Sequence, residues 1–151
     1  MKVHNLHTKN FGLDEFTRSS KAEKLGISNE VETTEQLVAI CNLMANVLQP
    51  VRDRLGFPIT ISSGYRNSKV NKIVQGSATS QHMKGQAADL QCFSNKKFDV
   101  KRTRELFKEL SEMDVDQLLY ERDSKGNIWV HVSYVSPEKN RHFIKDNYYA
   151  G

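Results

Sequence analysis

Long hydrophobic runs are missing from this chain, and cysteine and proline are scarce. The 151 residues include only two cysteines and three prolines. No apolar stretch approaches the roughly 20 residues that a membrane-spanning helix needs, so we expect no membrane insertion. The amino-terminal stretch MKVHNLHTKNFG has no continuous hydrophobic segment, so we also expect no signal peptide and a cytoplasmic protein.

The two cysteines, Cys41 and Cys92, lie within apolar patterns, and neither has a histidine nearby in the sequence. A cytosolic protein usually keeps such thiols reduced. We therefore interpret both as small core residues rather than as a disulfide or a catalytic nucleophile.

The net charge of +4 is modest, and the basic residues alternate with acidic ones along the chain. No basic stretch interleaved with aromatic residues is present, so we expect no nucleic-acid partner. Repeats, low-complexity segments and linkers rich in proline or glycine are also missing. We expect one domain, residues 1–151, in which residues 1–32 form an irregular arm with short helical turns.

Periodicity predicts one long helix over residues 33–56, with a capping box from Thr33 to Gln36 at its start and Gly56 at its end. Pro50 should kink this helix or split off its last turn. A short helix is expected over residues 67–76 and an amphipathic one over residues 98–113. Strands are predicted at residues 57–66, 86–93, 115–121, 127–134 and 141–146. These elements predict an α+β fold with an antiparallel sheet.

Three polar residues are candidate metal ligands: His82 in a loop, Asp89 on the strand that follows it, and His131 on a later strand. His82 and Asp89 flank a short glycine-containing stretch, QHMKGQAAD, in which Gly85 allows a tight turn. In the strand over residues 127–134, His131 shares a face with Trp129, while the valines take the core face. Two imidazoles and one carboxylate with an open fourth position are typical of a catalytic zinc site. Each residue alone is more often structural, and the combination carries the prediction.

The pattern Ser80-x-His82-x-x-Gly85-x-Ala87-x-Asp89, followed by Trp129-x-His131, resembles the zinc peptidases that cut peptidoglycan stem peptides. That family includes D-alanyl-D-alanine carboxypeptidases and dipeptidases and phage endolysins of the L-alanyl-D-glutamate type. The segments ITISSGYRN, VNKIVQGS, VDQLLYE and WVHVSY extend the resemblance. The segment FGLDEFTRSSKAEKLGI is similar to the small phage- and prophage-associated branch.

The resemblance implies a zinc ion held by His82, Asp89 and His131. It also implies a hedgehog/DD-peptidase-like fold, with helices packed on one side of the sheet. Arg66 matches the family's arginine, which binds substrate and steadies the developing oxyanion. The alternative for Arg66 is a plain surface arginine.

Two further residues have weaker implied roles. Ser80 matches the serine of the zinc motif and would bond to substrate or to the ligand loop, or be an ordinary loop serine. Trp129 would line the substrate cleft or simply pack on its strand.

Many relatives place the general base three positions before the last histidine, where this chain has Ile128. We expect Glu121 to replace it, because a hairpin register with partner numbers summing to 248 or 250 puts Glu121 on the face of His131. The small phage-associated branch carries a glutamate there. Asp116 is the reserve candidate, although its parity places it on the opposite face.

These expectations add up to a monomeric zinc metallopeptidase that hydrolyses peptidoglycan stem peptides, with D-alanyl-D-alanine carboxypeptidase activity favoured. One alternative is an L-alanyl-D-glutamate endopeptidase, an endolysin released by a holin or carried in a bacteriophage particle. A second alternative is a non-catalytic, zinc-containing module that binds the cell wall.

Overall fold

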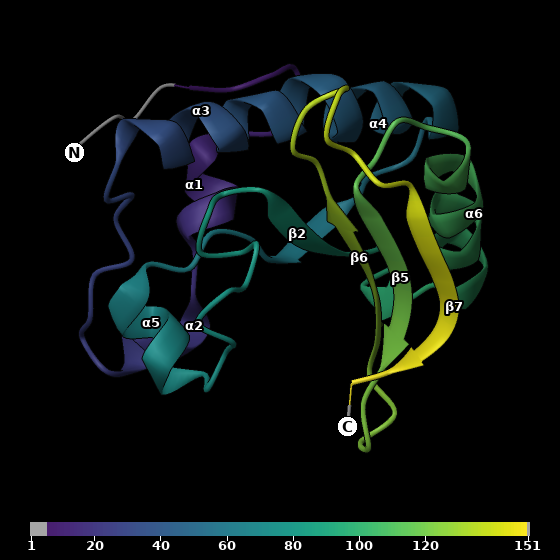
Figure 1. Ribbon diagram of the computed structural model, residues 1–151. Helices are drawn as coiled ribbons and strands as arrows, with labels where there is room; N and C mark the ends of the chain where they lie inside the picture. Colours follow the sequence, from purple (N-terminus) through teal and green to yellow (C-terminus); the bar gives the residue numbers. More distant parts are fainter. Residues whose placement is uncertain (1–5, 151) are drawn as a thin grey trace.

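The computed structural model describes residues 6–150. Its main feature is a sheet with a layer of helices on one face (Figure 1). The elements follow in this order: α1 (Leu13–Thr17), α2 (Ser20–Lys24), α3 (Thr34–Leu43), a π-helix (Met44–Leu48), α4 (Gln49–Leu55), β1 (Thr60–Ser63), α5 (Ser68–Ile73), β2 (Ala87–Gln91), β3 (Phe93–Ser94), β4 (Lys97–Phe98), α6 (Val100–Ser111), β5 (Gln117–Arg122), β6 (Ile128–Ser133) and β7 (Phe143–Tyr149). The α+β class is confirmed. Among the described residues, no helix is long and apolar enough to cross a membrane.

The main sheet has five strands in the order β1-β2-β6-β5-β7. The first four strands in this order form three antiparallel pairs, as predicted. The last strand differs, because β7 pairs with β5 in parallel and makes the sheet mixed. The reason is the link over residues 134–142, which passes the start of β5, where Phe143 donates its backbone N–H to the Asp116 carbonyl. The chain therefore sets out along β5 in the same direction as β5 itself.

Strand alternation separates a core face from an open face. Leu90, Leu118, Val130 and Val132 have no exposed surface and belong to the hydrophobic core on the helix side. Each such buried side chain stabilises the fold by roughly 1.5–3 kcal/mol relative to an exposed one. The amphipathic helix α6 covers this face and begins at Asp99, whose carboxylate accepts the Arg102 N–H. The opposite face is left open for the site.

The long helix has the predicted ends but a different interior. Thr33 and Gln36 form the capping box, and Gly56 ends α4 in the left-handed conformation. Pro50 does not split off the last turn, because residues 49–55 remain helical, and the alternative expectation of a kink stays a prediction. The helical hydrogen-bond pattern changes before Pro50, where Gln49 donates its N–H to the Met44 carbonyl five residues back. This π-type register precedes the proline, which lacks a donor of its own.

Residues 6–32 of the predicted arm pack on the domain, and residues 1–5 of this prediction lie outside the described part of the chain. Phe11, Leu13 and Phe16 are buried, and two short helices interrupt the arm as expected. Tyr65 donates its backbone N–H to the Phe16 carbonyl at 2.8 Å. The arm thereby supports the segment that leads from β1 to Arg66.

Candidate metal centre

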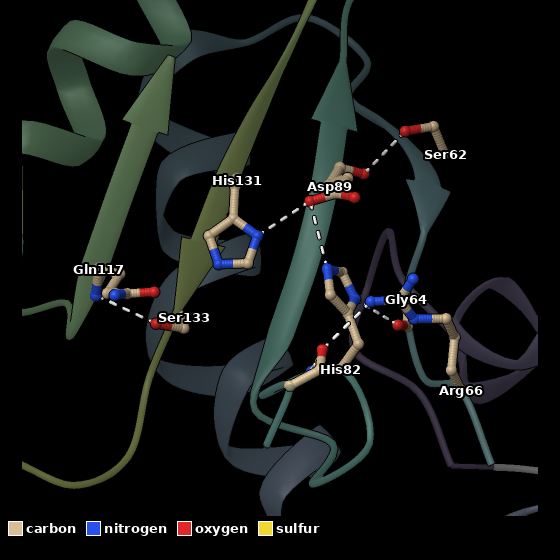
Figure 2. Close-up of polar contacts among 9 residues, drawn as sticks. Ser62, Gly64, Arg66, His82, Asp89, Gln117, His131 and Ser133 are labelled. Carbon is tan, nitrogen blue, oxygen red and sulfur yellow. Dashed lines mark hydrogen bonds and ion pairs between the residues drawn. The ribbon is translucent and has the colours of Figure 1, made fainter. Parts of the chain in front are cut away.

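The three predicted metal ligands converge on one point of the open sheet face (Figure 2). Asp89 in β2 and His131 in β6 are direct cross-strand partners, and His82 reaches in from the turn before β2. The Asp89 Oδ1 atom lies 3.0 Å from His131 Nδ1 and 3.3 Å from His82 Nε2. One ligand atom from each residue lies within 4.8 Å of the others.

These separations fit zinc. Tetrahedral ligands at about 2.1 Å from the ion stand roughly 3.4 Å apart. Two imidazole nitrogens and one carboxylate oxygen are also the donors that zinc prefers in catalytic sites. The residues present therefore fit a zinc ion with one position left for solvent or substrate.

The orientation of His82 is fixed by a second partner. Its Nδ1–H donates to the Gly64 carbonyl at 2.7 Å, which leaves Nε2 free to bind a metal (Figure 2). Metal-binding histidines usually have such a partner, because it sets the tautomer and holds the ring. The backbone after β1 thus takes part in building the site.

The turn that carries His82 is clamped against α3. Gly85 has a φ of 74°, and a Cβ added there would lie 2.5 Å from the Gln36 carbonyl oxygen. Gln36 also donates its side-chain N–H to the Met83 carbonyl at 3.1 Å. The glycine is therefore needed for both its conformation and its lack of a side chain.

The charges of the site influence one another. Burial alone would raise the pKa of Asp89, but the charge of His82 and hydrogen bonds from His131 and His82 outweigh it and lower that pKa. Burial opposes the charged form of His131, yet Asp89 and Glu121 raise its pKa overall. A divalent cation needs the ionised carboxylate together with neutral imidazoles, so a metal ion would compete with the protons that these hydrogen bonds share.

Glu121 lies on the metal side of the sheet. The observed register pairs Leu119 with His131 and Glu121 with Trp129, so the partner numbers sum to 250, one of the two predicted values. Burial and the charge of Asp89 raise the pKa of Glu121, while the charge of His131 offsets part of the rise. Ile128, at the position of the expected acid, packs against the hydrophobic core instead.

Asp116 is turned away from this role. Its buried carboxylate accepts hydrogen bonds from Gln81 at 2.9 Å and from the Arg141 guanidinium at 2.8 and 3.0 Å. These bonds lower the pKa of Asp116 to about 2, with those from Arg141 the largest cause. The residue is a structural link between the ligand turn and the start of β7.

Arg66 and Ser80 form a pair at the edge of the site. The Arg66 Nη2–H donates to the Ser80 Oγ at 3.1 Å, and the same oxygen accepts the His82 backbone N–H. Burial lowers the pKa of Arg66 and the charge of Asp89 raises it, but a guanidinium stays charged in either case. Its Nε is buried and makes no hydrogen bond within residues 6–150.

A cavity of about 1030 Å³ opens over the metal ligands. It is at the upper end of the size range of small-molecule sites. The predicted site residues all line it, namely Arg66, Ser80, His82, Asp89, Glu121, Trp129 and His131.

Sequence reasoning missed a second group of lining residues. The following were not singled out: Gln81, Lys84, Arg141, Phe143, Tyr148 and Tyr149. The aromatic cluster near the carboxyl terminus was the available signal, but the parallel pairing that brings it to the cavity has no mark in the sequence.

Comparison with known proteins agrees with the geometry. The family model described as Peptidase M15 matches residues 9–133, which include every predicted metal ligand. A search of curated proteins finds no significant match. Peptidases of this family are zinc-dependent and act on peptidoglycan peptides. With most of its length matched and a ligand set that fits the metal, the chain belongs to the Peptidase M15 family of zinc metallopeptidases.

Proposed function

We propose that this zinc peptidase hydrolyses a terminal amide bond of the peptidoglycan stem peptide, as a D-alanyl-D-alanine carboxypeptidase does. One observation carries the proposal: His82, Asp89 and His131 meet on the floor of a cavity that also holds Glu121 and Arg66. When bound, zinc lowers the pKa of a water ligand and polarises a carbonyl group.

Glu121 acts as the general base in this proposal. Its carboxylate takes a proton from the attacking water as the new C–O bond forms, and returns that proton to the nitrogen as the C–N bond breaks. The pKa of Glu121 is raised toward neutral pH, where a carboxyl group both accepts and returns a proton efficiently. Its place on the face of His131 supports the role.

Arg66 binds the substrate carboxylate and stabilises negative charge on the carbonyl oxygen. Its guanidinium is held by Ser80, so a planar pair of donors is already oriented before substrate arrives. Ser80 positions Arg66 and the His82 turn together. Trp129 forms part of the cavity wall.

The second candidate is cleavage inside the stem peptide, as in an L-alanyl-D-glutamate endopeptidase. The size of the cavity supports it, since about 1030 Å³ accommodates substrate on both sides of the cut. Arg66 supports the first candidate, since a fixed guanidinium suits a terminal carboxylate. The masses of the products distinguish the two.

The test uses purified protein with zinc and a set of defined muropeptides, followed by mass spectrometry. We expect release of D-alanine from pentapeptide stems. The Glu121→Gln variant should keep one zinc by elemental analysis and lose about 10²- to 10⁴-fold in kcat. Glu138→Gln, an exposed acid away from the cavity, is the matched control and should behave as wild type.

Zinc-loaded protein that cleaves no muropeptide would contradict the enzymatic proposal and favour the non-catalytic wall-binding module. A Glu121→Gln variant with full activity would leave hydrolysis standing and remove Glu121 from the mechanism.

A further inference from the structure

The strand β7 lies beyond the region that matches the family, yet it forms part of the cavity over the metal ligands. The family match ends at residue 133, whereas β7 spans Phe143–Tyr149. Phe143, Tyr148 and Tyr149 line the cavity and remain 48%, 39% and 58% exposed. Large exposed aromatic side chains continuous with an active-site cavity indicate a binding surface.

A β-bulge turns Tyr148 toward the cavity. In the first half of β7, Lys145 pairs with Leu119 on the open face, while Asp146 bonds to Arg104 of α6 on the helix face. Simple alternation would then place Tyr148 on the helix side. The register shifts between Leu119 and Glu121, so that Tyr148 pairs with Glu121 on the open face.

Asn147 provides the extra residue of this bulge. Its φ of 56° lies in the left-handed region, which asparagine tolerates better than most residues. The Lys145 Nζ lies 5.7 Å from the centre of the Tyr148 ring, so both side chains occupy the same face. Bulges beside active sites commonly re-aim a side chain in this way.

Positive groups flank the aromatic ones. Lys84 and Arg141 also line the cavity. Arg141 is fixed by Asp116 through its Nε and Nη2 atoms, and its Nη1 makes no hydrogen bond within residues 6–150. Aromatic faces beside a held guanidinium suit a peptide that carries carboxylates.

The strand order shows on which side of the metal ligands the β7 residues lie. The metal ligands come from β2 and β6 and from the turn before β2, and Arg66 follows β1, whereas β7 lies at the opposite edge of the sheet (Figure 1). From β6 to β7 the distance is two strand spacings, roughly 10 Å. An extended peptide covers that distance with about three residues.

We propose that the open face of β7 is a substrate subsite, built by Phe143, Tyr148 and Arg141, for an acidic stretch of stem peptide. The stretch lies on the opposite side of the cut bond from Arg66. This inference rests on the proposed function for the location of the cut. Binding of these remote residues helps to hold the reacting bond in place.

The test compares the stem peptide with versions shortened from either end that keep the bond cut by wild type. For Tyr148→Ala and Phe143→Ala, the ratio of kcat/KM for the full peptide to that for the peptide shortened on the β7 side should fall about tenfold. Ile144→Ala is the matched control, since Ile144 lies on the same strand, is similarly exposed and does not line the cavity. Asn147→Gly should keep the wild-type ratio, because glycine also tolerates the left-handed conformation.

A second readout does not depend on catalysis. Trp129 is the only tryptophan and lines the cavity, so its fluorescence should report binding of the full stem peptide to wild type. Tyr148→Ala should raise the dissociation constant about tenfold, and Ile144→Ala should leave it unchanged.

The outcomes separate the two proposals. If wild type cleaves the peptides but Tyr148→Ala and Phe143→Ala behave like Ile144→Ala, the subsite is overturned and the proposed function stands. If zinc-loaded wild type cleaves nothing, the proposed function fails. The fluorescence titration then decides the subsite by itself.

Discussion

At the scale of single residues, Asp89 contributes both its negative charge and its position between the two imidazoles to the metal site. One Asp89 oxygen lies within 3.3 Å of both imidazoles. We predict that Asp89→Asn, which keeps the shape and removes the charge, weakens zinc binding by at least ~100-fold, since even an outer partner is worth 10–100-fold. Competition with a chromophoric chelator measures the affinity. Asp14→Asn, at an exposed acid that does not line the cavity, should bind zinc like wild type.

Equal zinc affinity in Asp89→Asn and wild type would show that this carboxylate does not bind the metal. The fold of the variant is verified by circular dichroism, so that a loss of affinity is not confused with unfolding.

Arg66 tests whether geometry matters beyond charge. Arg66→Lys keeps a positive charge but has no planar fork, and it loses the bond that holds the side chain to Ser80. We predict a loss of about 10²-fold in kcat/KM with zinc content unchanged, similar to the removal of one oxyanion donor. Steady-state kinetics on the peptide that wild type cleaves provides the measurement. If Arg66→Lys had wild-type kinetics, only the positive charge at this position would matter, and the proposed role of the planar guanidinium would be contradicted.

The site residues differ in how far the sequence could predict them. Asp89 and His131 were predictable because strand alternation places polar side chains on one face and valines on the other. Tyr148 was not, because its direction depends on a bulge at Asn147. Asp116 was misjudged as a reserve base, because its partners Gln81 and Arg141 are far from it in sequence.

At the scale of elements, the turn between His82 and β2 depends on its contact with α3. We predict that Gly85→Ala destabilises the protein by more than the roughly 1–2 kcal/mol of a left-handed alanine, because its Cβ would also meet the Gln36 carbonyl at 2.5 Å. Denaturant unfolding measures the free energy. Gly126→Ala is the matched control, since its φ of 85° is similarly strained but nothing lies within 4 Å of the added atom.

The difference between the two variants isolates the contact with α3. Gly85→Ala should also weaken zinc binding, since the turn carries His82, while Gly126→Ala should not. Equal destabilisation of the two variants would mean that the turn moves freely away from α3.

Most helices and strands could be predicted from the sequence, but the pairing of the strands was harder to predict. Capping residues and hydrophobic periods marked the helices, because those signals are local. The direction of β7 depends on the path of residues 134–142 around the start of β5, which no local pattern specifies. The sequence therefore predicted an antiparallel sheet where the structure has a mixed one.

At the scale of the whole molecule, Asp116 connects the ligand turn, β5 and the start of β7 through Gln81 and Arg141. Its pKa falls to about 2 in the folded protein, below the ordinary value near 3.9. A lowered folded pKa stabilises the protein fully above the ordinary value and loses this effect as the pH falls toward 2. We predict that wild type is more stable than Asp116→Asn at pH 6, and that the charge-dependent part of this difference disappears between about pH 4 and pH 2.

Urea unfolding of both proteins at several pH values measures this difference. Asp53→Asn, an exposed acid on α4, controls for general charge effects. A stability difference that stays constant from pH 6 to pH 2 would show that the Asp116 charge does not support the fold.

The metal should stabilise the molecule as a whole, because its ligands come from β2, β6 and the turn between α5 and β2. Zinc that binds only the folded state at 100 times its dissociation constant adds about 2.7 kcal/mol. For a chain of this length each kcal/mol corresponds to roughly 2–4 °C, so removal of zinc should lower Tm by about 5–10 °C. Calorimetry with and without a chelator measures the shift, and restored zinc should reverse it. In Asp89→Asn the chelator should have little effect at the same zinc concentration, because the weakened site is largely empty; an equal shift in both proteins would mean that zinc stabilises the fold from somewhere else.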